Sequence, residues 1–206
     1  MLDLRSALNA CPIAAILRGV APQEIDAVGD ALIEAGITII EVPLNSPKPF
    51  DSIARLTGRH GGRALIGAGT VLDVADVARV ADAGGRLIVA PNFDADVVRA
   101  AKDAQLATLP GVMTPSEGFA ALKAGADGLK LFPAEIIPPA VFKAWRAVFP
   151  PDALLLAVGG VGVDNLRSYA QAGASGYGIG SALYKPGRPA AEIGALARAL
   201  VVAVKA

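Results

Sequence analysis

One segment of the chain has the sequence Gly128-Leu129-Lys130-Leu131-Phe132-Pro133, with a lysine inside a short apolar run. Successive side chains of a β-strand point to opposite faces, so the two leucines share one face and Lys130 and Phe132 share the other. If the leucines contact covering helices in a barrel, Lys130 points into the lumen near the carboxyl end of its strand. The segment therefore predicts a buried strand at residues 128–132 with one inward-facing amine.

The rest of the chain alternates short apolar runs with longer segments of helical spacing. This pattern is typical of a parallel sheet covered by helices. The predicted strands are residues 14–17, 38–42, 64–68, 87–90, 107–109, 128–132, 154–158 and 176–179. The predicted helices include residues 22–35, 74–83, 115–124, 164–172 and 190–204. Eight strands in 206 residues predict an α/β fold, a single (β/α)8 TIM barrel in which residues 1–206 form one domain.

The dipeptide Ala-Gly recurs ahead of four predicted strands, at Ala35-Gly36, Ala83-Gly84, Ala124-Gly125 and Ala172-Gly173. A left-handed glycine at the end of a helix explains each case locally. The recurrence every 41 to 48 residues also suggests a barrel built from quarter repeats of two βα units. An open doubly wound sheet is the structural alternative. It would need a Gly-x-Gly-x-x-Gly turn after the first strand, and the sequence at residues 18–22 lacks that turn.

Composition and charge argue against several partner classes. Hydrophobic residues make up 53% of the chain and charged residues 18%, as expected of a folded globular protein. The 19 basic and 19 acidic residues balance, so we expect no binding to nucleic acid or to a membrane. The apolar runs are also far shorter than the roughly 20 residues of a spanning helix. Cys11 is the only cysteine and no secretory-type leader is evident, so we expect a cytoplasmic protein.

Lys130 is the first candidate for chemistry. An ammonium group is costly to bury, so burial lowers the pKa of a lysine from its ordinary value of about 10.4. The neutral amine is a nucleophile that forms Schiff bases with ketones. The structural alternative is a lysine that reaches solvent from the strand end or pairs with a carboxylate.

Three further polar residues lie near the carboxyl ends of predicted strands. Glu41 interrupts the apolar strand at 38–42, where a carboxylate is a candidate proton shuttle. The structural alternative is an ion pair of Glu41 with Arg18 or Lys130. Arg18 follows the first strand and Thr70 follows the third, and an arginine beside glycine-exposed amides suits a substrate carboxylate. The carboxyl ends of barrel strands share one face, so the sequence predicts a common site for these groups.

Glycines follow the last two predicted strands. Gly159 and Gly160 come after residues 154–158, and Gly180 and Ser181 come after residues 176–179. Barrels commonly bind phosphate in these two loops, on backbone N–H groups that glycines leave accessible. Two ordinary strand-to-helix turns are the alternative. We favour a phosphate site, because both pairs lie in the expected loops.

Other kinds of site have no signature in the sequence. His60 is the only histidine, and its glycine-flanked position predicts a surface residue. No cysteine and histidine cluster offers a zinc site, and no clear signature marks an oxygen-only metal site. A Gly-x-Ser-x-Gly elbow and a Walker-type loop are also absent. We therefore expect no metal and no cofactor, and we favour amine chemistry over a metal enolate.

In order and content, these motifs resemble the 2-keto-3-deoxy-6-phosphogluconate and 2-keto-3-deoxy-6-phosphogalactonate aldolase family over essentially the whole chain. The matching segments are Ile16-Leu17-Arg18-Gly19, Glu41-Val42-Pro43-Leu44-Asn45-Ser46-Pro47, Gly67-Ala68-Gly69-Thr70-Val71, Pro91-Asn92, Lys130-Leu131-Phe132-Pro133, Gly159-Gly160-Val161 and Gly180-Ser181. The resemblance implies a homotrimeric barrel with Lys130 as the Schiff-base lysine and Glu41 as the general acid and base.

The same resemblance implies roles for the remaining candidates. Backbone groups near Gly159, Gly160, Gly180 and Ser181 would bind the phosphate of a phosphorylated keto-acid sugar. Arg18 and Thr70 would contact the substrate, with Thr70 at its carboxylate end. Phe132 and Pro91 would line the methyl side of pyruvate.

Two segments favour the phosphogalactonate branch. Enzymes of the gluconate type usually carry Thr-Leu-Arg-Thr and Pro-Thr-Gly-Gly where this chain has Pro43-Leu44-Asn45-Ser46 and Ala157-Val158-Gly159-Gly160. Because Asn45 replaces an arginine, Arg18 becomes the better candidate for a substrate contact. The two substrates are C4 epimers, so Val158 in place of a threonine hydroxyl is the expected discriminator.

The expected reaction is cleavage of 2-dehydro-3-deoxy-6-phosphogalactonate to pyruvate and D-glyceraldehyde 3-phosphate. The alternatives are the epimeric 6-phosphogluconate substrate, a phosphate-binding barrel of other chemistry, such as an epimerase or a synthase, and a non-catalytic sugar-phosphate binding protein. A barrel of other chemistry would not need an inward lysine beside Glu41, and neither alternative class would bind pyruvate covalently.

Overall fold

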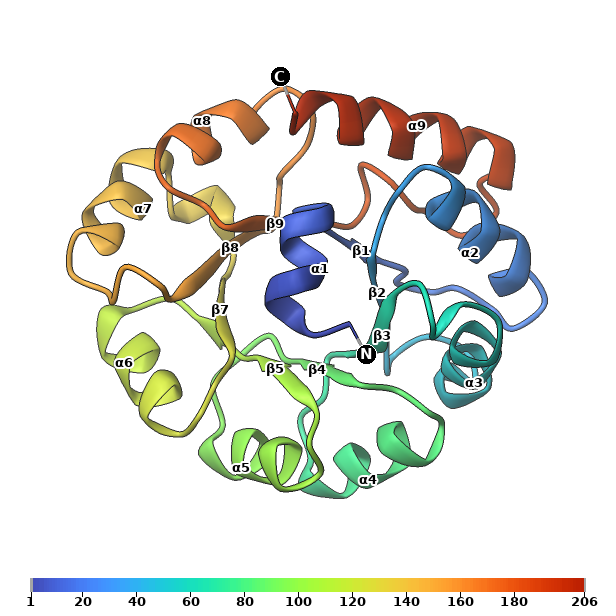
Figure 1. The fold of residues 1–206 in the computed structure, drawn as a ribbon, viewed down its shortest axis with the longest axis horizontal. Helices are drawn as coiled ribbons and strands as arrows, with labels where there is room; N and C mark the ends of the chain where they lie inside the picture. Colours follow the sequence, from blue (N-terminus) through green and yellow to red (C-terminus); the bar gives the residue numbers. More distant parts are fainter. Residues whose placement is uncertain (1, 206) are drawn as a thin grey trace.

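The strands form one parallel sheet that curls into a barrel with helices around it (Figure 1). The computed structural model describes residues 2–205. Nine strands lie in this range, in the sheet order β5-β4-β3-β2-β1-β9-β8-β7-β6. They are β1 (Ile13–Ile16), β2 (Ile39–Pro43), β3 (Leu65–Gly69), β4 (Leu87–Val89), β5 (Ala107–Leu109), β6 (Gly111–Val112), β7 (Gly128–Leu131), β8 (Leu154–Val158) and β9 (Gly176–Ile179). All eight predicted strands are confirmed, with ends within one residue of the prediction.

β5 and β6 are two parts of one barrel strand that Pro110 interrupts. Proline has no N–H to donate to a sheet. Its carbonyl still accepts a hydrogen bond from the N–H of Lys130 at 2.9 Å, and Asp127 N–H donates to Thr108 at 3.2 Å. The interrupted strand thus closes the sheet against β7, which gives the predicted eight-stranded (β/α)8 barrel.

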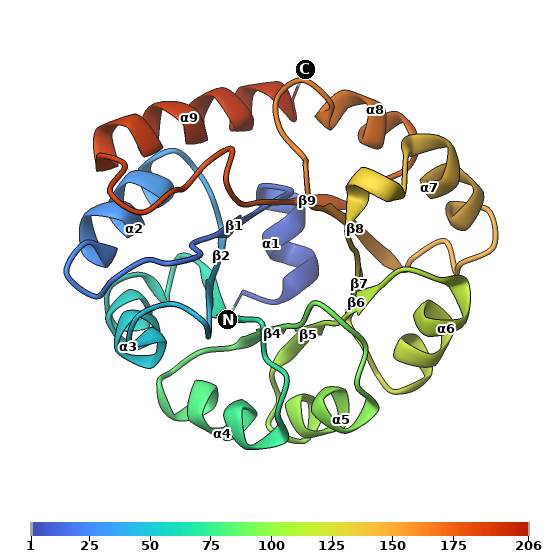
Figure 2. The ribbon, with the colours of Figure 1, turned by 180° about the vertical axis from the view of Figure 1, so that it is seen from behind.

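The helices form a ring outside the sheet (Figures 1 and 2). They are α2 (Ile25–Glu34), α3 (Pro49–His60), α4 (Val74–Asp82), α5 (Ala95–Asp103), α6 (Pro115–Lys123), α7 (Pro139–Arg146), α8 (Leu166–Gln171) and α9 (Ala190–Ala203), with a 3-10 turn η1 (Ala134–Ile136) after β7. The helices predicted at 22–35 and 164–172 begin later, at Ile25 and Leu166, because hydrogen-bonded turns precede them. Among the described residues, no helix is long and apolar enough to span a membrane.

Four of these helices end in the same glycine motif. Gly36, Gly84, Gly125 and Gly173 have φ values between 81° and 101°. After α2, for example, Gly36 N–H donates to Ile33 and Ile37 N–H donates to Leu32, both at 3.0 Å. This Schellman geometry confirms the predicted helix ends at all four Ala-Gly dipeptides.

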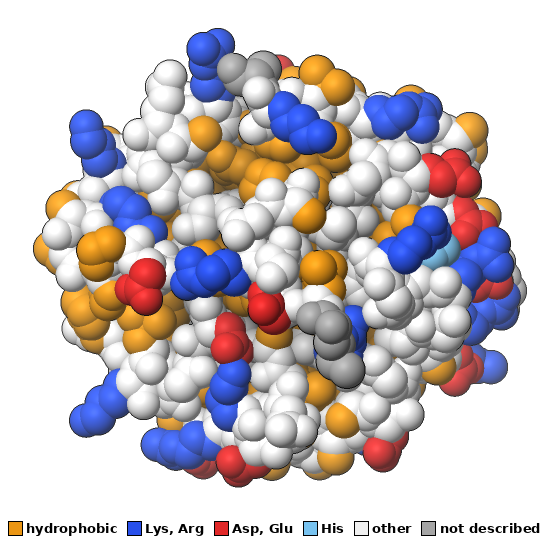
Figure 3. Space-filling model, viewed as in Figure 1, with side chains coloured by type: hydrophobic (Ala, Val, Ile, Leu, Met, Phe, Trp, Pro, Cys, Tyr) orange, Lys and Arg blue, Asp and Glu red, His pale blue; other side chains and the backbone are white. Residues whose placement is uncertain are grey.

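A short helix that the sequence did not reveal, α1 (Leu4–Ala10), closes the amino-terminal mouth of the barrel (Figure 1). Asp3 caps it by accepting a hydrogen bond from Ser6 N–H at 2.7 Å. Leu4, Ala7 and Leu8 are buried against lumen residues from the starts of the strands. Lysines, arginines and acids are interspersed over this face of the molecule (Figure 3).

The core has two parts, one on each face of the sheet. Leu129 and Leu131 belong to the larger cluster, between the strands and the helices. Ile16, Leu156 and Val158 belong to the smaller cluster, inside the lumen. The predicted orientation of β7 is therefore confirmed, with its leucines facing the helices and Lys130 facing inward.

Candidate active site

β7 places the Lys130 side chain inside the lumen. The residue is only 5% exposed, and its Nζ lies 4.8 Å from the centre of the Phe132 ring. Among residues 2–205, no carboxylate lies within 4.0 Å of this amine. An amine that is buried without a partner is costly for the fold, which points to a chemical role.

Glu41 enters the same lumen from β2 and is 3% exposed. Its Oε2 atom is buried without a hydrogen-bond partner in the described part of the chain. The carboxylate fits there because the adjacent strand carries Gly69, where an added β-carbon would lie 1.3 Å from Oε2. Gly69 therefore leaves the space that the Glu41 carboxylate fills.

The lumen moves the two pKa values toward each other. Burial raises the pKa of Glu41, and the charges of Lys130 and Arg18 only partly oppose this shift. Burial lowers the pKa of Lys130, the Glu41 charge opposes the shift, and Arg18 adds to it. The two groups are not ion-paired, so an amine whose pKa is lowered and an acid whose pKa is raised face one small recess.

The recess shares Lys130, Val158 and Gly178 with a wide cavity of ≈ 730 Å³ at the carboxyl ends of the strands, the end that faces the viewer in Figure 2. Eight of the predicted site residues line this cavity: Arg18, Lys130, Phe132, Val158, Gly159, Gly160, Gly180 and Ser181. Glu41, Lys130 and Val158 line the inner recess. The structure thus brings nine predicted residues into one continuous site.

The glycine loops provide free backbone amides to this cavity. Leu183 N–H and Tyr184 N–H both donate to the carbonyl of Gly180 at 2.9 Å, which closes a turn. Within the described chain, the N–H groups of Ser181 and Ala182 at the start of this turn have no acceptor, as expected at a helical N-terminus.

The loop after β8 lies beside this turn. Gly159 and Gly160 have φ values of 102° and 63°, which favour glycine. Asn165 fixes the loop, because its side chain donates to the Gly160 carbonyl and accepts from Gly162 N–H, both at 2.9 Å. The two loops together form a cradle suited to an anion.

Arg18 lies at the rim of the cavity. Its Nη1 donates to Oδ1 of Asn45 at 3.1 Å, and the next residue, Gly19, donates its N–H to the Ser46 hydroxyl at 2.9 Å. Asn45 stands where an arginine is usual in the gluconate-type enzymes, and here it orients the Arg18 guanidinium. Arg18 makes no ion pair with Glu41 among the described residues.

Two predicted contacts lie at neighbouring strand ends but outside the linings of these cavities. Thr70 and Pro91 directly follow β3 and Ala90 and are partly buried. Thr70 has a φ of 58°, a strained conformation for a β-branched residue. Their side chains are near the site, but the geometry gives them no defined contact.

Four ionisable residues of the cavity were not predicted from the sequence: Glu135, Asp164, Tyr184 and Lys185. Glu135, Asp164 and Lys185 are exposed, and no periodicity or motif marks them. The Tyr184 hydroxyl donates to the Glu24 carboxylate, and burial together with this contact raises the pKa of Tyr184. This hydrogen bond ties the loop after β9 to the start of α2.

His60 is not a surface residue, so that prediction is wrong. It lies in the last turn of α3, faces α2 and is 2% exposed. Its Nε2 is 3.1 Å from Asp30 Oδ1, and its Nδ1 is 3.2 Å from Nη2 of Arg63. The glycines after His60 follow the helix end and do not decide which way the ring points. No group of three or more metal-ligating side chains occurs among the described residues.

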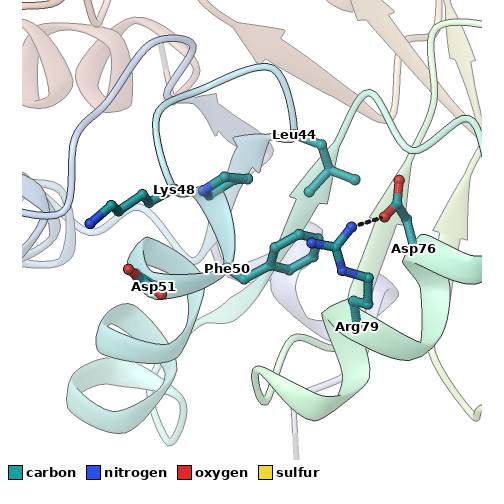
Figure 4. A pocket seen from close by; sticks show the side chains of 7 residues that line it. Leu44, Lys48, Phe50, Asp51, Asp76 and Arg79 are labelled. Carbon is teal, nitrogen blue, oxygen red and sulfur yellow. Dashed lines mark hydrogen bonds and ion pairs between the residues drawn. The ribbon is translucent and has the colours of Figure 1, made fainter.

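A second hollow lies outside the barrel lumen, near the starts of α3 and α4 (Figure 4). Its volume is ≈ 470 Å³, and none of the predicted site residues lines it. The Arg79 guanidinium lies 4.0 Å from the centre of the Phe50 ring and pairs with Asp76 at 2.7 Å. Because this cation is partnered by neighbouring side chains, the hollow offers no comparable reactive group.

Comparison with known proteins agrees with this geometry. The family model described as "KDPG and KHG aldolase" matches residues 4–192. The chain belongs to this aldolase family. One relative in the family is the "Probable 2-dehydro-3-deoxy-6-phosphogalactonate aldolase" of Rhizobium meliloti (strain 1021), which is 50% identical over 88% of this chain and 86% of its own length.

A second relative, the "2-dehydro-3-deoxy-6-phosphogalactonate aldolase" of Escherichia coli (strain K12), is 43% identical over 94% of this chain and 95% of its own length. Among solved structures, the "Native KDPGal structure" superposes with a TM-score of 0.93 at 43% identity and covers 94% of each chain. The similarity thus extends over nearly the whole barrel.

Proposed function

We propose that this protein is a class I aldolase that cleaves 2-dehydro-3-deoxy-6-phosphogalactonate to pyruvate and D-glyceraldehyde 3-phosphate through a Schiff base on Lys130. One observation carries the proposal. The Lys130 amine and the Glu41 carboxylate are buried in one lumen, and neither has an ion-pair partner among residues 2–205. A structural lysine or glutamate would be paired at this degree of burial.

The first half of the reaction forms the Schiff base. The neutral Lys130 amine attacks the C2 ketone of the substrate and gives a carbinolamine. Glu41 transfers the protons that allow this adduct to lose water as an iminium ion. The lowered pKa of Lys130 favours the free amine, and the raised pKa of Glu41 favours an acid that can give up a proton to the departing water.

The second half breaks the carbon–carbon bond. Glu41 takes the proton of the C4 hydroxyl while the electron pair of the C3–C4 bond moves into the iminium. Glyceraldehyde 3-phosphate leaves, and the remaining enamine is protonated at C3. Water then hydrolyses the imine, which releases pyruvate and restores the Lys130 amine.

Binding roles follow from the positions along the site. The free amides beside Gly160, Gly180 and Ser181 suit the phosphate, with Gly159 completing that loop. We assign the keto-acid end to the inner recess, with Arg18 at the rim and Thr70 near the carboxylate. We also assign Phe132 and Pro91 to the methyl side of pyruvate, and Val158, which lines the recess, to the C4 region.

The names of the two relatives support the phosphogalactonate substrate. We also propose that the protein is cytoplasmic, consists of one domain and forms a homotrimer, as the family resemblance implies. Leu72 and Met113 leave large apolar side chains about half exposed on loops at the carboxyl ends of the strands, at 56% and 50%. Such residues suit a subunit interface.

The test is reductive trapping. The protein is incubated with pyruvate and borohydride, and intact mass and peptide mapping then locate any adduct. We expect one pyruvate-sized adduct per chain on Lys130. If folded protein with active borohydride forms no adduct, the Schiff-base class is wrong, and a phosphate-binding barrel of other chemistry replaces it.

A further inference from the structure

Glu135 lies directly on the two glycines that follow β8. A β-carbon added at Gly159 would be 2.5 Å from its Oε2, and one added at Gly160 would be 2.6 Å from its Cγ. The carboxylate therefore occupies space that only a glycine pair leaves open, on the wall of the wide cavity. This places an acid at the edge of the anion cradle.

The acid is held there by a well-anchored element. Glu135 is the central residue of η1, which follows β7 five residues after Lys130. The buried Tyr169 hydroxyl donates to the carbonyls of Ala134 and Ile137, at 2.8 and 3.4 Å, one on each side of Glu135. The position of Glu135 is thus fixed by the fold more than that of a free loop residue.

Electrostatics alone would disfavour this arrangement. Among residues 2–205, no cation lies within 4.0 Å of the Glu135 carboxylate. A negative charge beside a phosphate cradle weakens anion binding unless it makes a compensating contact. An ionised carboxylate only accepts hydrogen bonds, so the compensating group must be a donor.

The substrate chain supplies such donors between its two acidic ends. The C4 hydroxyl belongs near Glu41, in the recess that Lys130 and Val158 line. The next hydroxyl, on C5, is adjacent to the carbon that bears the phosphate. Glu135 lies beside that end of the cavity, at Gly159 and Gly160.

We propose that Glu135 is a specificity-determining residue whose carboxylate accepts a hydrogen bond from the C5 hydroxyl of the substrate. The proposal rests on the proposed aldolase function. It assigns to this site a preference for aldehydes with a hydroxyl on the carbon next to the phosphate-bearing carbon. Removal of the Glu135 carboxylate has two opposing effects. Loss of the hydrogen bond to the C5 hydroxyl slows the reaction, whereas loss of charge repulsion with the phosphate speeds it.

The experiment uses the synthetic direction with pyruvate. Two acceptors are compared: D-glyceraldehyde 3-phosphate and 3-phosphooxypropanal, which lacks the hydroxyl in question. The proteins are wild type, Glu135→Gln and Glu135→Asp, with Asp164→Asn as a charge-matched control because Asp164 also lines the cavity. For each protein, kcat/KM is measured with both acceptors, and pyruvate trapping on Lys130 is measured alongside.

We expect Glu135→Gln to lower the preference for the hydroxylated acceptor about tenfold, as for a lost charge-assisted hydrogen bond. Glu135→Asp, which withdraws the carboxylate, should lower it in the same direction. Asp164→Asn should change both acceptors by one common factor. An unchanged preference in the Glu135 variants, or an equal rise for both acceptors, would overturn the proposal.

Pyruvate trapping distinguishes a failure of the Glu135 proposal from a failure of the proposed aldolase function. Retained pyruvate trapping in the Glu135 variants, together with a lost preference, supports Glu135 as a contact to the aldehyde portion. Absence of trapping in wild type would instead remove the aldolase function, and the Glu135 assignment with it.

Discussion

The lumen and the α2–α3 junction both bury ionisable side chains, but the two regions differ in whether those side chains have ion-pair partners. Lys130 and Glu41 are 5% and 3% exposed without an ion-pair partner among the described residues, whereas His60, 2% exposed, contacts Asp30 and Arg63. Asp30 also pairs with Arg59 at 2.6 Å. Burial is therefore common to both regions, and the absence of an ion-pair partner in the described part of the chain distinguishes the lumen.

This difference predicts that substitutions in one region change mainly turnover, and substitutions in the other change mainly the free energy of unfolding. A substitution in the lumen should remove turnover at little cost to the fold. A substitution at the α2–α3 junction should weaken the fold and leave turnover intact.

Lys130→Met gives the largest expected effect. It removes the nucleophile but keeps an unbranched apolar side chain, so turnover should fall by a factor on the order of 10³ or more. The free energy of unfolding should stay level or rise by about 1 kcal/mol, because a buried amine is lost. Steady-state kinetics and urea unfolding measure both quantities. Lys143→Met, at an exposed position on α7, is the control, and wild-type turnover in Lys130→Met would contradict the mechanism.

Gly69→Ala tests the positioning of Glu41. A β-carbon there would overlap Oε2, so the carboxylate must move away from the recess. We expect kcat to fall about 100-fold, since misplacement of a proton-transfer group by about 1 Å has effects of that order. Gly58→Ala, where a β-carbon meets no atom within 4 Å, is the matched control. Equal kcat values for the two variants would show that Glu41 does not depend on Gly69.

His60 should make stability depend on pH. Burial, with Arg63 and Arg59, lowers the pKa of His60 below its ordinary value, although Asp30 opposes the shift. The unfolded chain then binds a proton more readily, so stability is complete above about pH 6.5 and falls as the pH drops below that value. The pKa of Asp30 is lowered too, so its contribution persists until more acidic pH.

The measurement is urea unfolding at pH 8 and pH 5.5. His60→Gln should lose about 1–3 kcal/mol at pH 8, as expected for a disrupted buried polar contact, and should reduce the pH dependence. Its turnover at pH 8 should match wild type. A variant with wild-type stability and reduced turnover would reverse the assignment of the two regions.

Val158→Thr should have the smallest effect. Val158 lines both the inner recess and the wide cavity, and a threonine keeps its shape while adding a hydroxyl near C4. We expect the ratio of kcat/KM for the two C4-epimeric substrates to shift several-fold toward the phosphogluconate. Equal cleavage of both epimers by wild type and by the variant would remove Val158 as the discriminator.

The strands could be predicted to within one residue because apolar alternation and Ala-Gly helix ends are local signals. The inward direction of Lys130 followed from the same alternation. Helix α1 was missed because a seven-residue helix with three buried positions has too little periodicity to recognise. The split of one strand at Pro110 could not be predicted either, because it is recognised only from the hydrogen bonds that β7 and Asp127 make to both parts of that strand.

The site could be predicted where it depends on strand ends and glycine loops. Its missing members lie where no such signal exists: Glu135 is an exposed residue in a short 3-10 turn, and Tyr184 reaches Glu24 across 160 positions in sequence. The error at His60 has the same origin, because the packing of α3 against α2 decides its burial. Contacts between separate helices and strands leave no local pattern in the sequence.

The plug formed by α1 also constrains the order of events in catalysis. Because Leu4, Ala7 and Leu8 fill one mouth of the barrel, we expect substrate and products to pass through the wide cavity at the opposite mouth, beside the glycine loops. In the proposed reaction, pyruvate forms at the inner end, on Lys130, and the aldehyde forms at the outer end. The aldehyde must therefore depart before pyruvate, and in synthesis pyruvate must arrive first. A barrel closed at its base thus imposes an order on binding and release, in which the aldehyde binds last and leaves first.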